Sequence, residues 1–299
     1  MNLDISSKRS LGPLPAVGPL AFGHWRFVGH DVDRATALVE TALEIGMNLI
    51  DTADVYGLDW GGEGFGDAEG LLGKVLERSP GLRDQMVLAT KGGIVPGIPY
   101  DSSPVYLTKA LEGSLERLGV DHVDLYQIHR PDMFTHPEEV AQVLEGFVAS
   151  GKVRALGVSN FTPHQTAALA AFLGDDLVST QPQFSAVHLD PLRDGTLDQA
   201  MRLGLRPLAW SALGGGALAT GHGLRTELMV EIDGIAGALG VDRSAVALAF
   251  VLAHPSKPIA IVGSQRPERL RSAMKALDVT LTRGDVYTII EASEGTPLP

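Results

Sequence analysis

Cysteine is absent from the sequence, and its absence excludes two kinds of chemistry. A chain without thiols can form no disulfide bond and cannot use a thiolate as a nucleophile or as a metal ligand. A composition free of disulfides is typical of proteins in reducing compartments. We therefore expect a cytoplasmic protein.

Runs of basic residues are also lacking. Asp and Glu together number 36 and Lys and Arg 24, so the formal net charge is −12. A surface with this sign of charge repels nucleic acids and anionic membranes. We expect neither a nucleic-acid partner nor a membrane partner.

Long hydrophobic runs are missing as well. The longest apolar stretch with helical character, Ala245–Ala253, is about half a membrane span and is followed by His254 and Pro255. The N-terminal segment MNLDISSKRSLGPLP has no apolar core of the kind that a secretory signal requires. The sequence therefore predicts neither a membrane-spanning helix nor secretion.

Hydrophobic residues are nevertheless abundant, at 44% of the 299 residues, and no Ser- or Pro-rich linker divides the chain. We expect a single domain over residues 1–299, in which an apolar run, a turn and an amphipathic stretch recur. The predicted strands are Val17–Phe22, Met47–Ile50, Met86–Ala89, Val123–Ile128, Val153–Val158, Leu177–Thr180, Leu205–Ala209 and Pro258–Val262. The predicted helices are Asp33–Ile45, Ala68–Glu77, Pro104–Leu118, Pro137–Ser150, Pro163–Leu173, Leu197–Leu203, Thr226–Leu239, Arg243–Ala253 and Pro267–Ala276.

This alternation of strands and helices favours an α/β fold, the parallel (β/α)8 or TIM barrel, and the chain has the usual length of such a barrel. The pattern alone also allows an open doubly wound sheet. The phosphate-binding motif of those sheets, G-x-G-x-x-G, does not follow the first predicted strand. The glycine-rich segment Gly61–Gly66 follows the second strand without that spacing, and we interpret it as a flexible loop.

Ionisable residues stand at the ends of three consecutive predicted strands: Asp51, Lys91 and His129. Working residues in a (β/α)8 barrel lie at the C-terminal ends of the strands, so these side chains should project towards one mouth. Tyr56 follows in the loop after Asp51. Each residue alone has a structural explanation, as a cap, a packed ring, a turn residue or a core histidine. Their joint placement predicts an active site.

These four side chains suit the reduction of a carbonyl group. A tyrosine with an ordinary pKa of about 10 is a weak acid, and we expect the Lys91 ammonium to lower the pKa of Tyr56. Asp51 would hold Lys91 in place and keep it charged. His129 could donate a hydrogen bond to the substrate oxygen while Tyr56 protonates the developing alkoxide.

Six segments in order resemble the aldo-keto reductase family, and the compact bacterial branch most closely. They are LIDTADVYG (49–57), LATKGG (88–93), DLYQIHRPD (124–132), SGKVRALGVSNF (150–161), LAWSALGGGAL (208–218) and IVGSQRPERL (261–270). The resemblance covers nearly the whole chain. It implies that Asp51, Tyr56, Lys91 and His129 form the family's catalytic tetrad, with Tyr56 as the general acid.

The resemblance also implies a nicotinamide cofactor that lies across the barrel mouth. Ser159, Asn160 and Gln181 match positions that bind its carboxamide, and Phe184 falls near an aromatic position that stacks on its ring. Further contacts with the cofactor are expected from Gly23, His24, Trp25, Trp210, Ser211, Leu213, Gly214, Gly263 and Gln265.

Two positions, Ser264 and Arg269, match those that grip the 2′-phosphate of the adenosine, and they predict NADPH and NADP+ in preference to NADH. The family often carries a Lys or Arg around residues 263–265, which this sequence lacks, and Arg266 or Arg269 can supply that charge. The alternative is that Arg266, Arg269 and Arg271 form a solvated helix face.

The substrate pocket is expected to be walled by Trp25 and Trp60 beside Tyr56 and His129. The tail after Lys275 is short, which predicts a comparatively open pocket. A small carbonyl compound or alcohol is the expected ligand, and we expect a monomer or a weak homo-oligomer.

Other activities stay compatible with parts of the sequence. Lys91 at a strand end suits a Schiff-base aldolase, but that reaction needs a neutral amine, and Asp51 would keep Lys91 charged. A metal-dependent hydrolase is disfavoured because the histidines form no H-x-H pair, and we expect no metal. A cofactor-binding regulatory subunit with little turnover would keep the same four residues, so the motifs do not distinguish it from a reductase.

Overall fold

The computed structural model describes Ile5 and residues 7–299. Residues 1–4 and 6 lie outside the described part, and with them the beginning of the N-terminal segment discussed above.

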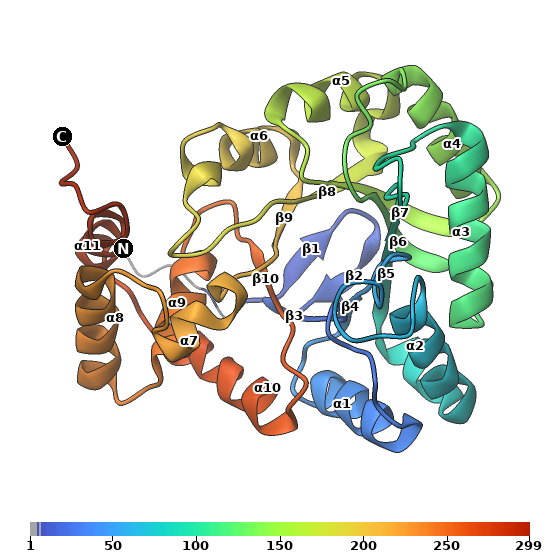
Figure 1. Cartoon of the computed structure of the whole chain (residues 1–299). Helices are drawn as coiled ribbons and strands as arrows, with labels where there is room; N and C mark the ends of the chain where they lie inside the picture. The colour runs from blue at the N-terminus through green and yellow to red at the C-terminus, as the bar shows by residue number, and fades with distance from the viewer. Residues whose placement is uncertain (1–4, 6) are drawn as a thin grey trace.

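Eight parallel strands close into a barrel in the order β10-β3-β4-β5-β6-β7-β8-β9, as predicted, with helices on the outside (Figure 1). The strands are β3 (Leu20–Gly23), β4 (Leu49–Asp51), β5 (Val87–Gly92), β6 (Val123–Ile128), β7 (Val153–Ser159), β8 (Leu177–Gln181), β9 (Arg206–Ala209) and β10 (Ile259–Val262). The register sets neighbours at the strand ends: Gly23 pairs with Asp51, and Lys91 pairs with Gln127. Side chains that were far apart in the sequence therefore share one rim.

The predicted start of the first barrel strand, at Val17, is wrong. Val17 ends a separate strand, and the barrel strand starts only at Leu20, because Gly18 and Pro19 interrupt the run. Pro19 has no N–H for a strand ladder. Its carbonyl accepts a hydrogen bond from the Ala260 N–H at 3.0 Å, which joins the chain to β10.

A β-hairpin of β1 (Arg9–Leu11) and β2 (Leu14–Val17), which the pattern did not predict, plugs one end of the barrel. Leu11, Leu14 and Val17 are buried in one cluster with side chains from inside the barrel, among them Val178. The tight turn needs Gly12, which has φ +53°, and a Cβ there would lie 2.3 Å from Val178 Cγ1. The hairpin closes this end, so access is left to the C-terminal mouth.

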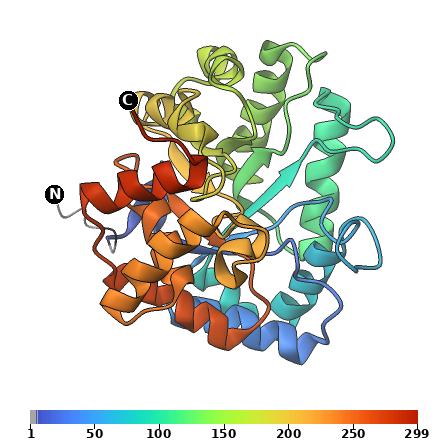
Figure 2. The same cartoon turned by 60° about the vertical axis from the view of Figure 1, so that its left-hand side comes forward.

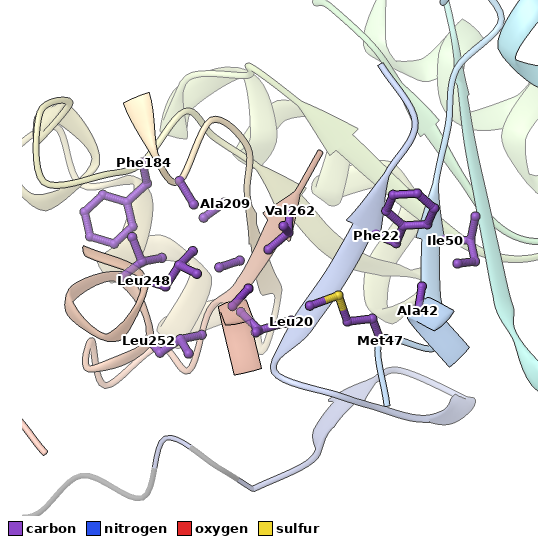
Figure 3. Packing of buried hydrophobic residues seen from close by; sticks show 14 of the residues in the cluster. Leu20, Phe22, Ala42, Met47, Ile50, Phe184, Ala209, Leu248, Leu252 and Val262 are labelled. Atoms are coloured by element: carbon purple, nitrogen blue, oxygen red, sulfur yellow. The ribbon is translucent and has the colours of Figure 1, made fainter. Parts of the chain in front are cut away.

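A second and larger core lies between the strands and the helices (Figure 3). The helices around it are α1 (Val32–Glu44), α2 (Asp67–Arg78), α3 (Pro104–Leu118), α4 (Pro137–Ala149), α5 (Pro163–Leu173), α6 (Thr196–Leu203), α7 (Ala217–Thr220), α8 (Thr226–Leu239), α9 (Arg243–Leu252), α10 (Pro267–Ala273) and α11 (Arg283–Glu294). Sequence signals fixed several of their ends. The hydroxyls of Ser103 and Thr162 cap α3 and α5, and Gly119 ends α3 in the left-handed conformation.

Our description of the C-terminal tail as short is wrong, because the tail forms a further helix, α11. Thr282 and Asp285 form a capping box at its start, a signal that the sequence analysis missed. The helix packs on α8 at the outside of the barrel (Figure 2). Arg193 ties its end to the loop after β8 with two hydrogen bonds to Glu294, of 2.9 and 2.7 Å.

Within the described residues, no single helix is long and apolar enough to cross a membrane. The pair α8 and α9 meets the length and composition only when joined across a bend of 100°. The same part of the chain holds no group of three or more His, Cys, Asp or Glu side chains placed to bind a metal ion.

Candidate active site

Lys91, at the end of β5, lies at the centre of a buried hydrogen-bonded group. Its Nζ donates to Asp51 Oδ2 at 2.8 Å, to the Thr52 carbonyl at 2.7 Å and to the Tyr56 hydroxyl at 3.2 Å. An ammonium has three N–H donors, and all three have a partner here. The structure thus brings Asp51, Lys91 and Tyr56 together, and it fixes the ammonium against the phenol oxygen.

His129 joins this group from the end of β6. Its ring lies edge-on to the Tyr56 ring, with the centroids 5.7 Å apart. The His129 backbone N–H donates to the Gly92 carbonyl at 2.8 Å, which aligns the two strand ends. His129 Nδ1 is buried and has no partner among the described residues. The ring therefore has hydrogen-bonding capacity to offer a ligand.

Burial and neighbouring charges together set the protonation states of Lys91 and His129. Burial alone would lower the pKa of Lys91, but Asp51 and Tyr56 beside its Nζ raise that pKa above the ordinary value. Burial likewise lowers the pKa of His129 well below its ordinary value, and the charges of Lys91 and Arg130 add to this. At neutral pH the site therefore holds an ammonium and a neutral imidazole. A charged Lys91 is a poor Schiff-base nucleophile, which argues against the aldolase alternative.

Tyr56 departs from our expectation. Burial raises the pKa of Tyr56 above its usual value, and the opposing effect of Lys91 is not large enough to bring the net shift below it. Lys91 acts in the expected direction, because its charge and its hydrogen bond lower the pKa of the phenol, but burial outweighs this effect and the expected net fall towards neutrality does not occur. The phenol stays protonated at neutral pH, which is the form that a proton donor needs.

Gln127 is a member of this group that the sequence analysis missed. Its Nε2 donates to Asp51 Oδ1 at 3.2 Å, and Gln181 Nε2 donates to the same oxygen at 3.0 Å. Gln127 is fully buried inside β6. Because Gln181 uses its amide on Asp51, it supports the ion pair in this structure. The available signal for Gln127 was its place two residues before His129, which puts both side chains on the same face of the strand.

Asn160 links the ends of β7 and β9. It has a left-handed backbone, with φ +59°. Its Nδ2 donates to Ser159 Oγ at 2.8 Å and to the His129 carbonyl at 3.2 Å, and its Oδ1 accepts from Trp210 Nε1 at 3.0 Å. Ser159, Asn160 and Trp210, all predicted cofactor residues, therefore form one connected set beside His129.

The loop after β9 is partly exposed to solvent. Ser211 has φ +54°, and its hydroxyl accepts a hydrogen bond from the Gly215 N–H at 2.8 Å. A Cβ at Gly215 would have no atom within 4 Å, so there is free space beside this residue. Leu213 and Gly214 lie in the same turn, half-buried. Arg26, from the loop after β3, donates to the Gly215 carbonyl at 3.1 Å and links the two loops.

Beyond β10, Gly263, Ser264 and Gln265 are half-buried and Arg269 is exposed on α10. Neighbouring arginines are occupied: Arg266 bonds Glu268 at 2.7 Å, and Arg271 bonds Glu44 at 2.8 Å. The side chain of Arg269 has neither a hydrogen bond nor an ion pair to any residue that the structure describes.

Trp25 and Trp60, from the loops after β3 and β4, lie against each other. The rings of Trp25 and Trp60 have centroids 5.0 Å apart, and both are partly exposed. The Arg26 guanidinium lies 4.4 Å from the Trp60 ring centroid and 5.5 Å from that of Trp25. A cation held between two rings fixes this wall of the mouth.

Phe184 does not lie at the mouth. Its ring is buried and lies 6.1 Å from that of Phe250 on α9, centroid to centroid, among the side chains between strands and helices (Figure 3). The prediction that Phe184 stacks on a nicotinamide ring is therefore wrong: two residues past the proline that follows β8, the ring points to the helix layer. Trp210, half-buried and bonded to Asn160, is the aromatic residue that the structure places beside the predicted carboxamide residues.

The His24 ring is also turned away from the mouth. It is fully buried and stacked on Phe27, with centroids 4.1 Å apart and neither ring nitrogen paired among the described residues. Burial, with a smaller contribution from the charge of Lys91, lowers the pKa of His24 to about 3. This neutral ring has no exposed surface that a cofactor could contact. The prediction that the His24 side chain contacts the cofactor is therefore wrong.

Behind the loop of Tyr56 lies a buried acidic cluster that the sequence analysis missed. Glu69 on α2 accepts a hydrogen bond from the Thr90 hydroxyl, and it forms an ion pair with Arg117 on α3 at 2.7 Å. Asp54 is fully buried beside them, and burial raises its pKa well above the ordinary value, with the charge of Glu69 adding to the shift. Asp54 also anchors the loop of Tyr56, because its backbone N–H donates to the Lys91 carbonyl at 3.0 Å.

The family model described as the aldo/keto reductase family matches residues 19–294. The chain belongs to this family. This aldo/keto reductase is similar to a 6-dehydroglucose reductase of Novosphingobium aromaticivorans. The two chains are 51% identical over 287 residues, which cover 95% of this chain and 94% of the relative.

Two further similarities extend this assignment. A 6-dehydroglucose reductase of Agrobacterium fabrum is 37% identical over 291 residues, with 92% of this chain and 95% of the relative covered. The crystal structure of an aldo/keto reductase from Klebsiella pneumoniae in complex with NADP and acetate superposes with a TM-score of 0.82 at 25% identity, covering 98% of this chain and 96% of that one. This aldo/keto reductase thus shares both sequence and fold with oxidoreductases over nearly its full length.

Proposed function

We propose that this aldo/keto reductase reduces an aldehyde or ketone to the alcohol with NADPH, and that Tyr56 is the proton donor. The observation that carries the proposal is the 3.2 Å hydrogen bond from Lys91 Nζ to the Tyr56 hydroxyl, in a group that also holds Asp51 and a neutral His129. Bound NADPH would supply the hydride.

The residues of the chain would do the rest of the work. As the carbonyl oxygen gains negative charge, Tyr56 gives its proton, and the Lys91 ammonium stabilises the phenolate that forms. Neutral His129 can donate one N–H to the same oxygen. Asp51 keeps Lys91 charged and oriented, with Gln127 and Gln181 holding its other oxygen.

The residues around the mouth fit a dinucleotide. The free space beside Gly215 leaves room for a pyrophosphate, and Asn160 with Ser159 suits a carboxamide. We assign the ring-stacking role to Trp210 in place of Phe184. Arg269, exposed and unpaired within the described chain, suits a 2′-phosphate and supports NADPH over NADH. The chain lacks cysteine, which is typical of proteins in reducing compartments, and this composition favours a cytoplasmic location.

The substrate we propose is a hydroxylated aldehyde such as 6-dehydroglucose, on the basis of the 51% identity to a reductase of that name. The test is oxidation of NADPH, followed by its absorbance, with 6-dehydroglucose, glyceraldehyde and 4-nitrobenzaldehyde. Turnover that is lost in Tyr56→Phe is expected. Tight binding of NADPH with no turnover of any of the three would instead support a regulatory subunit.

A further inference from the structure

An exposed aromatic side chain stands on the loop between β6 and α4. Phe134 is 96% exposed, the highest value for a large hydrophobic residue in the described part of the chain, and Met133 beside it is also exposed. Hydrophobic residues that are exposed singly are common on protein surfaces, so exposure alone does not indicate a function. Phe134 differs from such residues in how firmly its loop is held and in what lies next to it.

One carboxylate fixes the loop of Phe134. Asp132 Oδ1 accepts a hydrogen bond from the Phe134 N–H at 2.9 Å. Asp132 Oδ2 accepts from the Thr135 hydroxyl at 2.6 Å and from the Ser102 N–H, in the loop after β5, at 3.0 Å. Burial opposes the ionisation of Asp132, but these hydrogen bonds outweigh it and lower the pKa of Asp132, so they persist at neutral pH. A ring on a fixed turn loses little conformational entropy when a partner covers it.

An apolar hollow of about 250 Å³ adjoins this loop. Side chains of α4 and α5, which pack side by side, form two of its walls (Figure 1). The apolar residues that line it include Pro131, Met133, Val140, Phe161, Ala168 and Leu169. Met133 and Thr135, on either side of Phe134 in the sequence, both line the hollow, so the ring and the hollow are neighbours on one surface. Apolar cavities of about 150 Å³ accept benzene, so this hollow has room for a phenyl ring.

We infer that this surface binds a second copy of the chain, with Phe134 of each copy in the hollow of the other. In a two-fold dimer the same surface patch meets itself, which requires a protruding group and its receptor to lie side by side. Asp132 is the one ionisable side chain among the described residues that line the hollow, and both of its oxygens already accept hydrogen bonds. The hollow therefore brings no unpaired charge into the contact. The dimer does not depend on the proposed reduction and can be tested without a substrate.

The area available to this contact is that of a weak dimer. An aromatic side chain buries roughly 150–250 Å², so two rings and the walls that receive them account for roughly 600–1,000 Å². Ile98 and Val105 are exposed in the segment that Ser102 joins to Asp132, and they can add to this area. Specific interfaces begin at about 1,200 Å², so we expect an association that depends on concentration.

The first test is sedimentation equilibrium of the full chain, whose mass is 31.6 kDa. For the wild type, the average mass should rise towards twice this value as the concentration approaches about 1 mM. Phe134→Asp should stay at the mass of one chain, because it would place a charge in an apolar hollow. The matched control is Val230→Asp, at an exposed valine of α8 on another side of the barrel, which should associate like the wild type (Figure 1). A wild type that keeps the mass of one chain throughout would overturn the inference.

Two further variants test whether the ring and the hollow fit each other. Phe134→Ala removes the ring and keeps the hollow, whereas Ala168→Trp, at an exposed position of α5, fills the hollow and keeps the ring. Each variant alone should associate about tenfold or more weakly than the wild type, the usual effect of removing a central aromatic contact. A mixture of the two can form one ring-in-hollow contact and should associate more strongly than either variant alone. If the mixture is no stronger, the ring and the hollow do not pair.

Other occupants of the hollow would give different results. If the wild type stays monomeric and binds the apolar dye 8-anilinonaphthalene-1-sulfonate in a way that Ala168→Trp abolishes, the hollow is a site for a small apolar ligand and the dimer is refuted. Burial of apolar surface persists in about 1 M NaCl, whereas exposed ion pairs are screened within about 3 Å. Association that such salt abolishes would therefore assign the contact to charged groups and overturn the role of Phe134.

Discussion

Lys91 Nζ donates a hydrogen bond to the Tyr56 hydroxyl across 3.2 Å, although the two residues are 35 positions apart in the chain. The contact depends on the parallel register that brings the ends of β4 and β5 together. It also depends on the Asp54 N–H, which holds the loop of Tyr56 against the Lys91 carbonyl. The backbone thereby fixes the phenol that we propose as the proton donor beside the charge that would stabilise its phenolate.

Replacing Tyr56 with Phe removes the hydroxyl and keeps the ring. We expect kcat to fall by about 10²–10⁴-fold, the usual contribution of a positioned acid. NADPH affinity, measured by fluorescence titration, should stay nearly unchanged. A variant that keeps more than about a tenth of the wild-type rate would show that another group donates the proton.

The pH dependence of reduction follows from two pKa shifts. The pKa of His129 lies well below its ordinary value, so the ring is neutral across the range in which a free histidine titrates. The pKa of Tyr56 is raised, so the phenol loses its proton only in strongly basic solution. We expect kcat/KM for reduction to be level between about pH 6 and 9 and to decline above about pH 10. A step near pH 6.5 that His129→Gln removes would contradict a neutral His129.

Substituting Gln127 with Leu removes one of the two amide donors to Asp51 Oδ1. Loss of a hydrogen bond to a charged group costs about 1.5–3 kcal/mol, so we expect lower stability in urea unfolding. The freed carboxylate should also hold Lys91 less firmly, which lowers kcat more than it raises KM. The control is Gln85→Leu at an exposed glutamine. If Gln127→Leu changes stability but neither kcat nor its pH profile, Gln127 is structural only.

Removing Arg117 leaves the buried carboxylate of Glu69 with the Thr90 hydroxyl and no counter-charge. Breaking a buried ion pair in this way costs about 3–5 kcal/mol, and we expect Arg117→Met to lower the free energy of unfolding by that order. Arg271→Met breaks an exposed pair with Glu44 and should leave the free energy of unfolding nearly unchanged. Similar losses from both substitutions would mean that the Glu69 pair is effectively solvated.

Arg269→Ala tests the choice of cofactor. If Arg269 binds the 2′-phosphate, the dissociation constant for NADPH should rise by about tenfold or more, as expected for a lost charge-assisted contact, while that for NADH changes little. Fluorescence titration with both cofactors measures this. An equal loss for both would remove Arg269 from the 2′-phosphate site.

The amino-acid sequence by itself determined the barrel and the residues that meet at its mouth. Apolar runs, turns and caps located all eight barrel strands to within a few residues. In a parallel barrel every strand delivers its last residues to the same rim, so Asp51, Lys91 and His129 could be placed together from their positions alone. Tyr56 could be placed with them because the loop that connects it to Asp51 is short.

The tertiary structure alone decided which way individual side chains point. Phe184 and His24 follow strand ends, yet packing against Phe250 and Phe27 turns both rings into the core. It likewise decided that Gln127 supports Asp51 and that Phe134 stands exposed beside an apolar hollow. The physical reason is that a strand pattern fixes position along the barrel, whereas the direction of a side chain beyond a strand end depends on its packing, against near neighbours such as Phe27 and against distant residues such as Phe250.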